Sequence, residues 1–266
     1  MTVLKYKIVR SHKRKRAVFL LCVAHSLFLQ TNSTHKSMMN TQGKTIKAVI
    51  FDLDGTLLDT LADLTDSVNY ALRTFGHSPA SVRERGIEEI RRFVGNGVRN
   101  LMKRALPEDT DEQAFEEAFA IFRTHYMEHC QDKTRPYDGI MELLRELKHM
   151  GIRMAIVSNK LQPAVEALRA RYFDDLIKVA IGESREVRRK PAPDAILLAL
   201  QRLGCSREEA IYVGDSEVDI ATAQAAGLPC ISVTWGFRER ALLESCHPHA
   251  IATTPHDILP SVVAQL

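Results

Sequence analysis

The sequence predicts an α/β protein built on a parallel sheet, and three observations support this prediction. Short runs of branched apolar residues recur along the chain. Longer stretches with apolar residues at helical spacing separate these runs. Four of the helical stretches end at a glycine, a residue that commonly terminates helices. Strands that alternate with helices in this way form a parallel sheet with right-handed crossovers.

The apolar runs have the length and composition of buried parallel strands, which are usually apolar throughout. They cover residues 47–51, 153–157, 177–181, 210–213 and 230–233. The predicted helices cover residues 61–75, 141–150, 193–203 and 217–226. Ser206 and Glu209 have the spacing of a helix capping box. Together these elements predict a doubly wound, Rossmann-like parallel sheet.

The interval between the first two predicted strands is far longer than a normal crossover. It spans about 100 residues, whereas most connections are much shorter. It contains apolar faces typical of helices, such as Phe115, Phe122 and Tyr126, but no convincing strand. The sequence therefore predicts a helical cap over residues 64–135, inserted into a core domain of residues 46–63 and 136–266.

Composition and charge exclude several classes of protein. The 266 residues are 45% hydrophobic and 26% charged, which is ordinary for a globular chain and excludes disordered, collagen-like and polytopic membrane proteins. Residues 1–45 hold nine of the 36 Lys and Arg and none of the 33 Asp and Glu, so the remainder has a net charge of −6. This acidic body argues against a nucleic-acid binder.

The first 45 residues form an extension with a composition of its own. A basic segment precedes an apolar run at residues 17–29, which resembles a secretory signal but lacks a small-x-small cleavage site. Met38 and Met39 offer an alternative translation start, and we favour this interpretation over a signal. The five cysteines form no CxxC pair, which is typical of reduced thiols. We therefore expect a cytoplasmic protein without membrane association.

Polar side chains follow three of the predicted strands. Ligands of open α/β sheets bind beyond the carboxyl ends of the strands, so these side chains are candidates for one site. The candidates, together with a lysine before the helix that precedes the fourth strand, are Asp52, Asp54, Ser158, Asn159, Lys190, Asp215 and Asp219. Clustered carboxylates repel one another unless a cation joins them. Oxygen ligands in this number favour Mg²⁺, which usually also takes a phosphate oxygen.

These elements, in this order, resemble the four motifs of the haloacid dehalogenase (HAD) superfamily of aspartyl phosphotransferases. The resemblance runs from about residue 48 to the C-terminus, and the helical insert resembles the cap of the family. Within the superfamily the chain is similar to phosphoglycolate phosphatases. Gly95-Asn96-Gly97-Val98, followed by Arg104-Ala105-Leu106, resembles the cap segment of that group.

The resemblance implies a role for each acidic candidate. Asp52 would be the nucleophile, because an ionised carboxylate can attack phosphorus once Mg²⁺ screens the repulsion. Asp54 would be the general acid and base, and its main-chain carbonyl would bind the metal together with the side chains of Asp52 and Asp215. Asp219 would orient either the water shell of the metal or Lys190.

The remaining candidates would bind substrate. Ser158 and the backbone amide of Asn159 would hold the phosphoryl oxygens, and Lys190 would neutralise their charge. In the cap, Gly95, Asn96, Gly97 and Arg99 are candidates for substrate selection, with Arg92 and Lys103 as further cations. The alternative interpretations are a plain turn for the glycines and solvated side chains for the cations.

The expected activity is a Mg²⁺-dependent phosphatase that converts a small phosphomonoester, best 2-phosphoglycolate, to glycolate and phosphate through an aspartyl-phosphate. Alternatives within the superfamily are a pyrophosphatase, a sugar-phosphate phosphatase and a phosphomutase. A phosphoryl-accepting signalling receiver is disfavoured by the cap and by the Asp52-x-Asp54 pair. The expected partner is a small phosphorylated metabolite, without nucleic acid or membrane, and the expected state is a monomer or homodimer.

Overall fold

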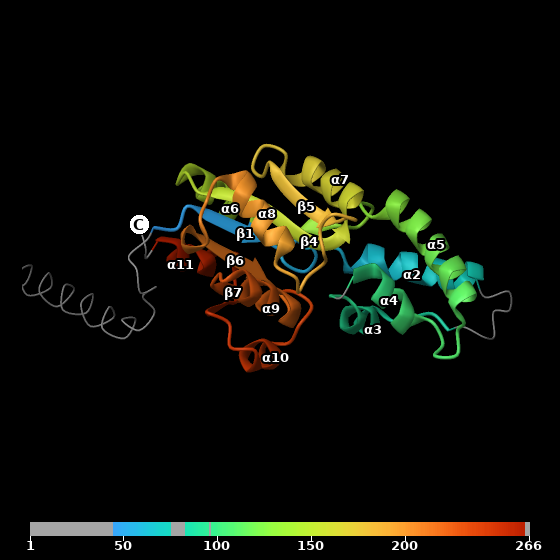
Figure 1. Cartoon of the computed structure of the whole chain (residues 1–266). Coiled ribbons are helices and arrows are strands. Elements are labelled where there is room, and N and C mark those ends of the chain that lie inside the picture. Colours follow the sequence, from blue (N-terminus) through green and yellow to red (C-terminus); the bar gives the residue numbers. More distant parts are fainter. Residues whose placement is uncertain (1–44, 76–82, 96, 264–266) are drawn as a thin grey trace, which may run out of the picture. The chain divides into compact units, whose positions relative to one another are not determined.

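The computed structural model describes residues 45–75, 83–95 and 97–263, and its centre is a six-stranded sheet (Figure 1). The strand order is β5-β4-β1-β6-β7-β8, and every neighbouring pair is parallel. The strands are β1 (Ala48–Phe51), β4 (Arg153–Leu161), β5 (Val179–Glu183), β6 (Ala210–Gly214), β7 (Cys230–Val233) and β8 (Ala250–Ala252).

Helices cover both faces of the sheet, as a doubly wound fold requires. One face packs against α6 (Ile140–His149), α7 (Gln162–Phe173) and α11 (Leu259–Val263). The other packs against α8 (Asp194–Leu203), α9 (Glu217–Ala226) and α10 (Arg240–Ser245). Short 3₁₀ turns cover Arg207–Glu209 and Pro255–Ile258.

The sequence of β1 explains how one strand serves both cores. Val49 and Phe51 belong to the hydrophobic core with α6, α7 and α11, whereas Ala48 and Ile50 belong to the core with α8, α9 and α10. Successive side chains of a strand point to opposite faces, so an uninterrupted apolar run is buried on both. The predicted fold class is therefore confirmed.

The cap interval is helical. It contains α2 (Leu61–Phe75), α3 (Ile87–Phe93), α4 (Gly97–Ala105) and α5 (Glu112–His129), which share a hydrophobic core of their own. Phe115, Phe122 and Tyr126 of the predicted α5 face are buried in it. Just outside the helices, β2 (Leu58–Asp59) pairs antiparallel with β3 (Arg135–Pro136). Because the predicted boundary at residue 64 falls inside α2, we propose that the cap begins and ends at this pair.

The structure differs from the sequence prediction at several element ends. β4 continues to Leu161, which pairs with Glu183 after an irregularity. The predicted strand ends at residue 157 because the residues that follow are polar and do not have the apolar pattern of a buried strand. β5 lies two residues later than predicted, and the short strands β2, β3 and β8 were not predicted. At the predicted capping box, the Glu209 side chain accepts a hydrogen bond from the Ser206 N–H (3.0 Å), and a 3₁₀ turn follows.

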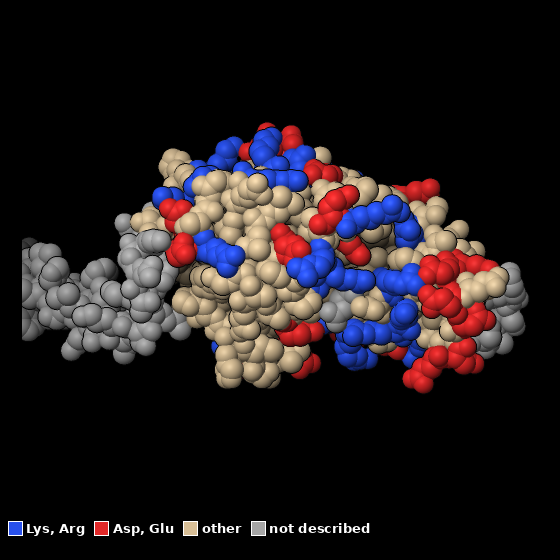
Figure 2. Space-filling view, in the orientation of Figure 1, with Lys and Arg blue, Asp and Glu red and all other residues tan. Residues whose placement is uncertain are grey.

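The surface carries both signs of charge on the face shown in Figure 2. Lys and Arg side chains gather where Figure 1 places α3 and α4 beside the loop that precedes α8. Within the described residues, no helix is both long and apolar enough to cross a bilayer. The predicted extension lies outside the described residues except for Thr45, and its role stays a prediction.

Candidate active site

The site lies where the strand order reverses. β1 and β6 are neighbours, but the chain proceeds from β1 toward β4 and β5 and from β6 toward β7 and β8. Open α/β sheets bind ligands at such a switch point, beyond the carboxyl ends of the strands. Asp52 directly follows β1, and Asp215 directly follows β6.

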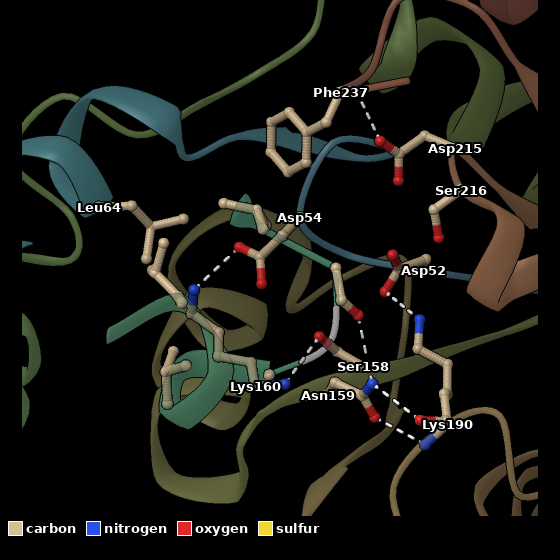
Figure 3. Close-up of a pocket in the computed structure, with 15 residues that line it drawn as sticks. Asp52, Asp54, Leu64, Ser158, Asn159, Lys160, Lys190, Asp215, Ser216 and Phe237 are labelled. Atoms are coloured by element: carbon tan, nitrogen blue, oxygen red, sulfur yellow. Dashed lines mark hydrogen bonds and ion pairs between the residues drawn. The ribbon is translucent and has the colours of Figure 1, made fainter. Parts of the chain in front are cut away.

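Six of the predicted core residues line a single small pocket with a volume of about 50 Å³ (Figure 3). They come from three strand ends and the loop before α8, and they are Asp52, Asp54, Ser158, Asn159, Lys190 and Asp215. The cap contributes Leu64, Gly95, Gly97 and further apolar residues. Segments far apart in the sequence thus meet in one place, although the roles assigned to their side chains stay predictions.

Asp52 is buried beside a lysine ammonium. Its Oδ1 lies 2.8 Å from Lys190 Nζ. Burial, followed by repulsion from Asp219 and Asp215, raises the pKa of Asp52 well above its usual value, and Lys190 opposes this shift. Burial by itself would lower the pKa of Lys190, but the Asp219 and Asp52 carboxylates outweigh it and raise that pKa. A cation is therefore fixed beside the proposed nucleophile.

Asp219 holds this lysine in place and is completely buried. Its Oδ1 lies 2.7 Å from Lys190 Nζ and accepts a hydrogen bond from the Tyr212 hydroxyl (3.0 Å). Its Oδ2 accepts hydrogen bonds from the N–H (3.1 Å) and hydroxyl (2.6 Å) of Ser216. Both oxygens are thus engaged by the protein. Of its two predicted tasks, this geometry favours the orientation of Lys190.

The Asp215 side chain is closely surrounded by main-chain atoms of Gly55, Gly236 and Phe237. Its Oδ2 accepts a hydrogen bond from the Phe237 N–H (2.6 Å). A Cβ atom at Gly55, where φ is +85°, or at Gly236 would collide with this side chain, so both positions require glycine. Burial, followed by repulsion from Asp219, raises the pKa of Asp215 to about 7.

The donor set fits a hard divalent cation. Within the part of the chain that the structure describes, Asp52, Asp215 and Asp219 form a group with ligand atoms within 4.8 Å of one another. Three buried carboxylates face a single ammonium, Lys190, so negative charge is in excess. A divalent ion would relieve the repulsion that raises the carboxylate pKa values. Since the oxygens of Asp219 are engaged, Asp52 and Asp215 are the side chains that remain to bind it.

Asp54 has a partner that the sequence analysis missed. Its Oδ1 lies 2.8 Å from Nζ of Lys160, which is buried in the pocket wall (Figure 3). Lys160 also donates a hydrogen bond to the Tyr126 hydroxyl on cap helix α5. Lys160 could have been predicted from the sequence, because it directly follows Ser158-Asn159 in a strand next to β1.

Ser158 and Asn159 lie in the irregular part of β4. The Asn159 side chain binds the main chain of Lys190, accepting from its N–H (2.7 Å) and donating to its carbonyl (3.2 Å). Ser158 Oγ accepts from the Lys160 N–H (3.2 Å). Asn159 therefore fixes the loop that carries Lys190, a contribution of its side chain that the sequence did not predict.

Only some of the predicted cap residues line the pocket. Gly95 and Gly97 line the pocket, and Asn96 lies outside the described residues. Arg99 does not line the pocket, because its guanidinium pairs with Glu112 (2.8 Å) and with Glu116 on α5, and its role in substrate selection stays a prediction. Two carboxylates of the neighbouring helix hold it there.

The two further cap cations do not line the pocket either. Lys103 lies over the Phe115 ring, 5.3 Å from its centroid. Arg92 is exposed. The surface of the cap, rather than the pocket wall, holds these side chains.

The loop after β7 joins the core to the cap. Phe237 lines the pocket and packs in the cap core. The Arg238 guanidinium donates hydrogen bonds to the carbonyls of Val94 (2.6 Å) and Arg91 (3.2 Å) and pairs with Glu217 (2.7 Å). Arg91 in turn donates to the Gly236 carbonyl (3.2 Å). These contacts were invisible in the sequence because they connect segments about 145 residues apart.

Comparison with known proteins places this arrangement in a family. Residues 49–233 match the family model described as haloacid dehalogenase-like hydrolase. The chain is 34% identical over 224 residues to phosphoglycolate phosphatase 1 of Pseudomonas aeruginosa, covering 80% of this chain and 79% of that protein. It is 36% identical over 220 residues to a phosphoglycolate phosphatase of Rhodobacter capsulatus, covering 81% and 96%.

Solved structures agree with the sequence relatives. The crystal structure of a predicted phosphoglycolate phosphatase from Haemophilus somnus is similar, with a TM-score of 0.74 and 27% identity. The match covers 81% of this chain and 97% of that one. The chain therefore belongs to the haloacid dehalogenase-like hydrolase family, as a phosphatase that resembles the phosphoglycolate phosphatases.

Proposed function

We propose that this protein hydrolyses a small phosphomonoester, best 2-phosphoglycolate, to the alcohol and inorganic phosphate, with Mg²⁺ as cofactor. One observation carries the proposal: the buried Asp52 carboxylate shares a pocket with Lys190, Asp215 and Asp54. A nucleophile, a fixed cation, a further metal ligand and an acid are the groups that phosphoryl transfer to a carboxylate needs.

In the first step, an Asp52 carboxylate oxygen attacks phosphorus. A new P–O bond forms while the bond to the leaving oxygen breaks, and the electron pair goes to that oxygen. Asp54 donates a proton to it, so the alcohol leaves neutral. Lys190, Ser158 and the Asn159 N–H stabilise the charge that spreads over the phosphoryl oxygens.

In the second step, Asp54 accepts a proton from a water molecule. The water oxygen attacks the phosphorus of the aspartyl-phosphate, the bond to Asp52 breaks, and inorganic phosphate leaves. One residue thus serves as acid and then as base, which restores the starting state.

Asp52, Asp215 and the main-chain carbonyl of Asp54 would hold Mg²⁺. When bound, the ion would neutralise part of the phosphate charge, so that an anionic carboxylate can approach an anionic ester. Phosphate monoesters need rate enhancements of up to ~10²¹, more than one group provides. Positioning in a pocket covered by the cap therefore has to contribute as well.

The substrate assignment rests on pocket size, charge and the named relatives. The pocket is small, with a volume of about 50 Å³, and its wall includes two lysines and several apolar residues. Lys and Arg also gather on the surface beside α3 and α4 (Figure 2), and such a field attracts anions. The Pseudomonas aeruginosa and Rhodobacter capsulatus relatives are named phosphoglycolate phosphatases. A cytoplasmic location and a monomeric or homodimeric state stay predictions.

A substrate panel tests the proposal. Phosphate release is measured with Mg²⁺ from 2-phosphoglycolate, pyrophosphate, several sugar phosphates and an aryl phosphate. We expect the highest kcat/KM for 2-phosphoglycolate. Asp52→Asn should lower kcat at least ~10⁴-fold, because an amide is a poor nucleophile. The control Asp174→Asn changes an exposed side chain on the surface of the core and should leave kcat unchanged.

The possible outcomes separate activity from substrate. Failure of wild type on every compound, or full activity of Asp52→Asn, would contradict the mechanism. A preference for pyrophosphate or a sugar phosphate would replace only the substrate. A phosphoenzyme that forms without net hydrolysis would indicate a phosphomutase instead.

A further inference from the structure

We infer that Lys160 selects the substrate by binding an anionic group, best a carboxylate, on the leaving alcohol. The inference rests on the proposed function and adds the residue that recognises the part of the substrate that is not transferred. It starts from a feature that the mechanism leaves unused. A lysine with 2% side-chain exposure lies in the pocket wall, and the proposed mechanism gives it no role of its own.

The two lysines of the pocket wall have different surroundings. Among the described lining residues, Lys160 and Lys190 are the cations. Lys190 Nζ lies beside the nucleophile Asp52 and is shared with Asp219. Lys160 Nζ lies beside the proton donor Asp54, at 2.8 Å from its Oδ1. One ammonium therefore serves the transferred phosphoryl group, and the other lies on the side of the leaving group.

The position of Lys160 fits a short carboxylate. Asp54 must contact the leaving oxygen to protonate it, and Lys160 contacts Asp54. A carboxylate that is separated from the leaving oxygen by a single methylene group is within reach of the same ammonium. Lys160 has three N–H donors, and its bonds to Asp54 and to the Tyr126 hydroxyl use two of them.

Lys160 is a buried ammonium with one acidic partner. Among the described residues it forms an ion pair with Asp54, and its Nζ also donates to the uncharged Tyr126 hydroxyl. A buried cation is stabilised by anionic contacts, and an anionic group on the leaving alcohol would provide a further one at the same ammonium.

The remaining wall favours a carboxylate over a sugar. Leu64, Val98, Leu101 and Phe237 line the pocket, and their side chains offer no hydrogen bonds to sugar hydroxyls. A low-dielectric wall also strengthens the attraction between an ammonium and a carboxylate. Tyr126 holds Lys160 from the cap side, so the cation is in position when the cap covers the pocket.

Two substrates of equal size test the inference. We compare kcat/KM for 2-phosphoglycolate with kcat/KM for 2-phosphoglycolamide, in which an uncharged amide replaces the carboxylate. Wild type should prefer the carboxylate about 100-fold. Lys160→Met, which keeps the length but removes the charge, should reduce this preference to less than about threefold. Lys160→Arg should restore part of it.

The ratio of the two kcat/KM values distinguishes substrate selection from a general loss of activity, because a defect in the position of Asp54 lowers kcat/KM for both compounds. Lys103→Met is the matched control, since this cap lysine lies outside the pocket wall and its loss should leave the ratio unchanged. Circular dichroism and thermal melting verify that each variant folds. If Lys160→Met does not fold, the ratio in wild type decides.

Each remaining result has a definite meaning. Equal kcat/KM for the two compounds in wild type, or an unchanged preference in folded Lys160→Met, would overturn the inference while the proposed phosphatase activity stands. Loss of the preference in Lys103→Met would also overturn it. No turnover of either compound by wild type would overturn this inference together with the assignment of 2-phosphoglycolate as substrate, whereas the phosphatase activity itself is decided by the full substrate panel.

Discussion

At the scale of the residue, the Asp215 carboxylate is the proposed metal ligand whose charge is most sensitive to pH. It is buried, it makes no ion pair among the described residues, and its hydrogen-bond donor is the Phe237 N–H. Its pKa is raised to about 7, first by burial and then by Asp219. In the absence of metal, therefore, a proton competes for this side chain near neutral pH.

This competition predicts how Mg²⁺ affinity depends on pH. Asp215 and Asp52, whose pKa values are both raised, must be deprotonated to bind the ion, so affinity should rise with pH through the range around 7. Below that range, the Kd should increase by about tenfold or more for each pH unit. The fluorescence of Trp235, the single tryptophan, can report binding because its Nε1 donates to the Thr56 carbonyl in the loop after β1 (3.0 Å).

Asp215→Asn should bind Mg²⁺ weakly at every pH, whereas the surface variant Asp174→Asn should follow wild type. An affinity that does not change between about pH 5 and pH 8 would contradict the assignment of Asp215 as a ligand. So would tight binding by Asp215→Asn.

At the scale of the element, the loop after β7 connects the proposed metal site to the cap. Phe237 bonds Asp215 through its N–H and packs its ring in the cap core. The next residue, Arg238, binds two carbonyls at the end of α3. A shift of the cap would therefore disturb the residue that supports Asp215.

We predict that Arg238→Ala weakens closure of the cap over the pocket. The variant loses hydrogen bonds from a charged donor, each of which contributes about 1.5–3 kcal/mol. KM should rise and kcat/KM should fall about tenfold or more, and hydrogen exchange should increase in α3 and α4. Arg240→Ala, which removes an exposed ion pair two residues later, is the control and should behave as wild type. Equal kinetics for the two variants would contradict the connection.

At the scale of the whole molecule, the sequence predicted the sheet and the core of the site because their signals are local. Apolar runs marked β1, β4, β6 and β7, and the polar residues that follow them meet because parallel strands end at one edge. Arg238 was missed because its contacts connect the core to the cap, and Lys160 was missed because its partner Asp54 is 106 residues away in the chain. A lone cation such as Arg99 does not reveal which carboxylates will pair with it. The three-residue strand β8 was too short to recognise.

The whole fold places Asp52, the proposed nucleophile, in one pocket with a buried ammonium and the proposed metal ligand Asp215, and detection of the covalent intermediate tests this proposal most directly. Wild type is mixed with 2-phosphoglycolate and Mg²⁺, quenched in acid within milliseconds, digested and analysed by mass spectrometry. The account predicts a phosphoryl group on Asp52, absent from Asp52→Asn. Turnover without any phosphorylated peptide, or with the phosphoryl group on another residue, would contradict it.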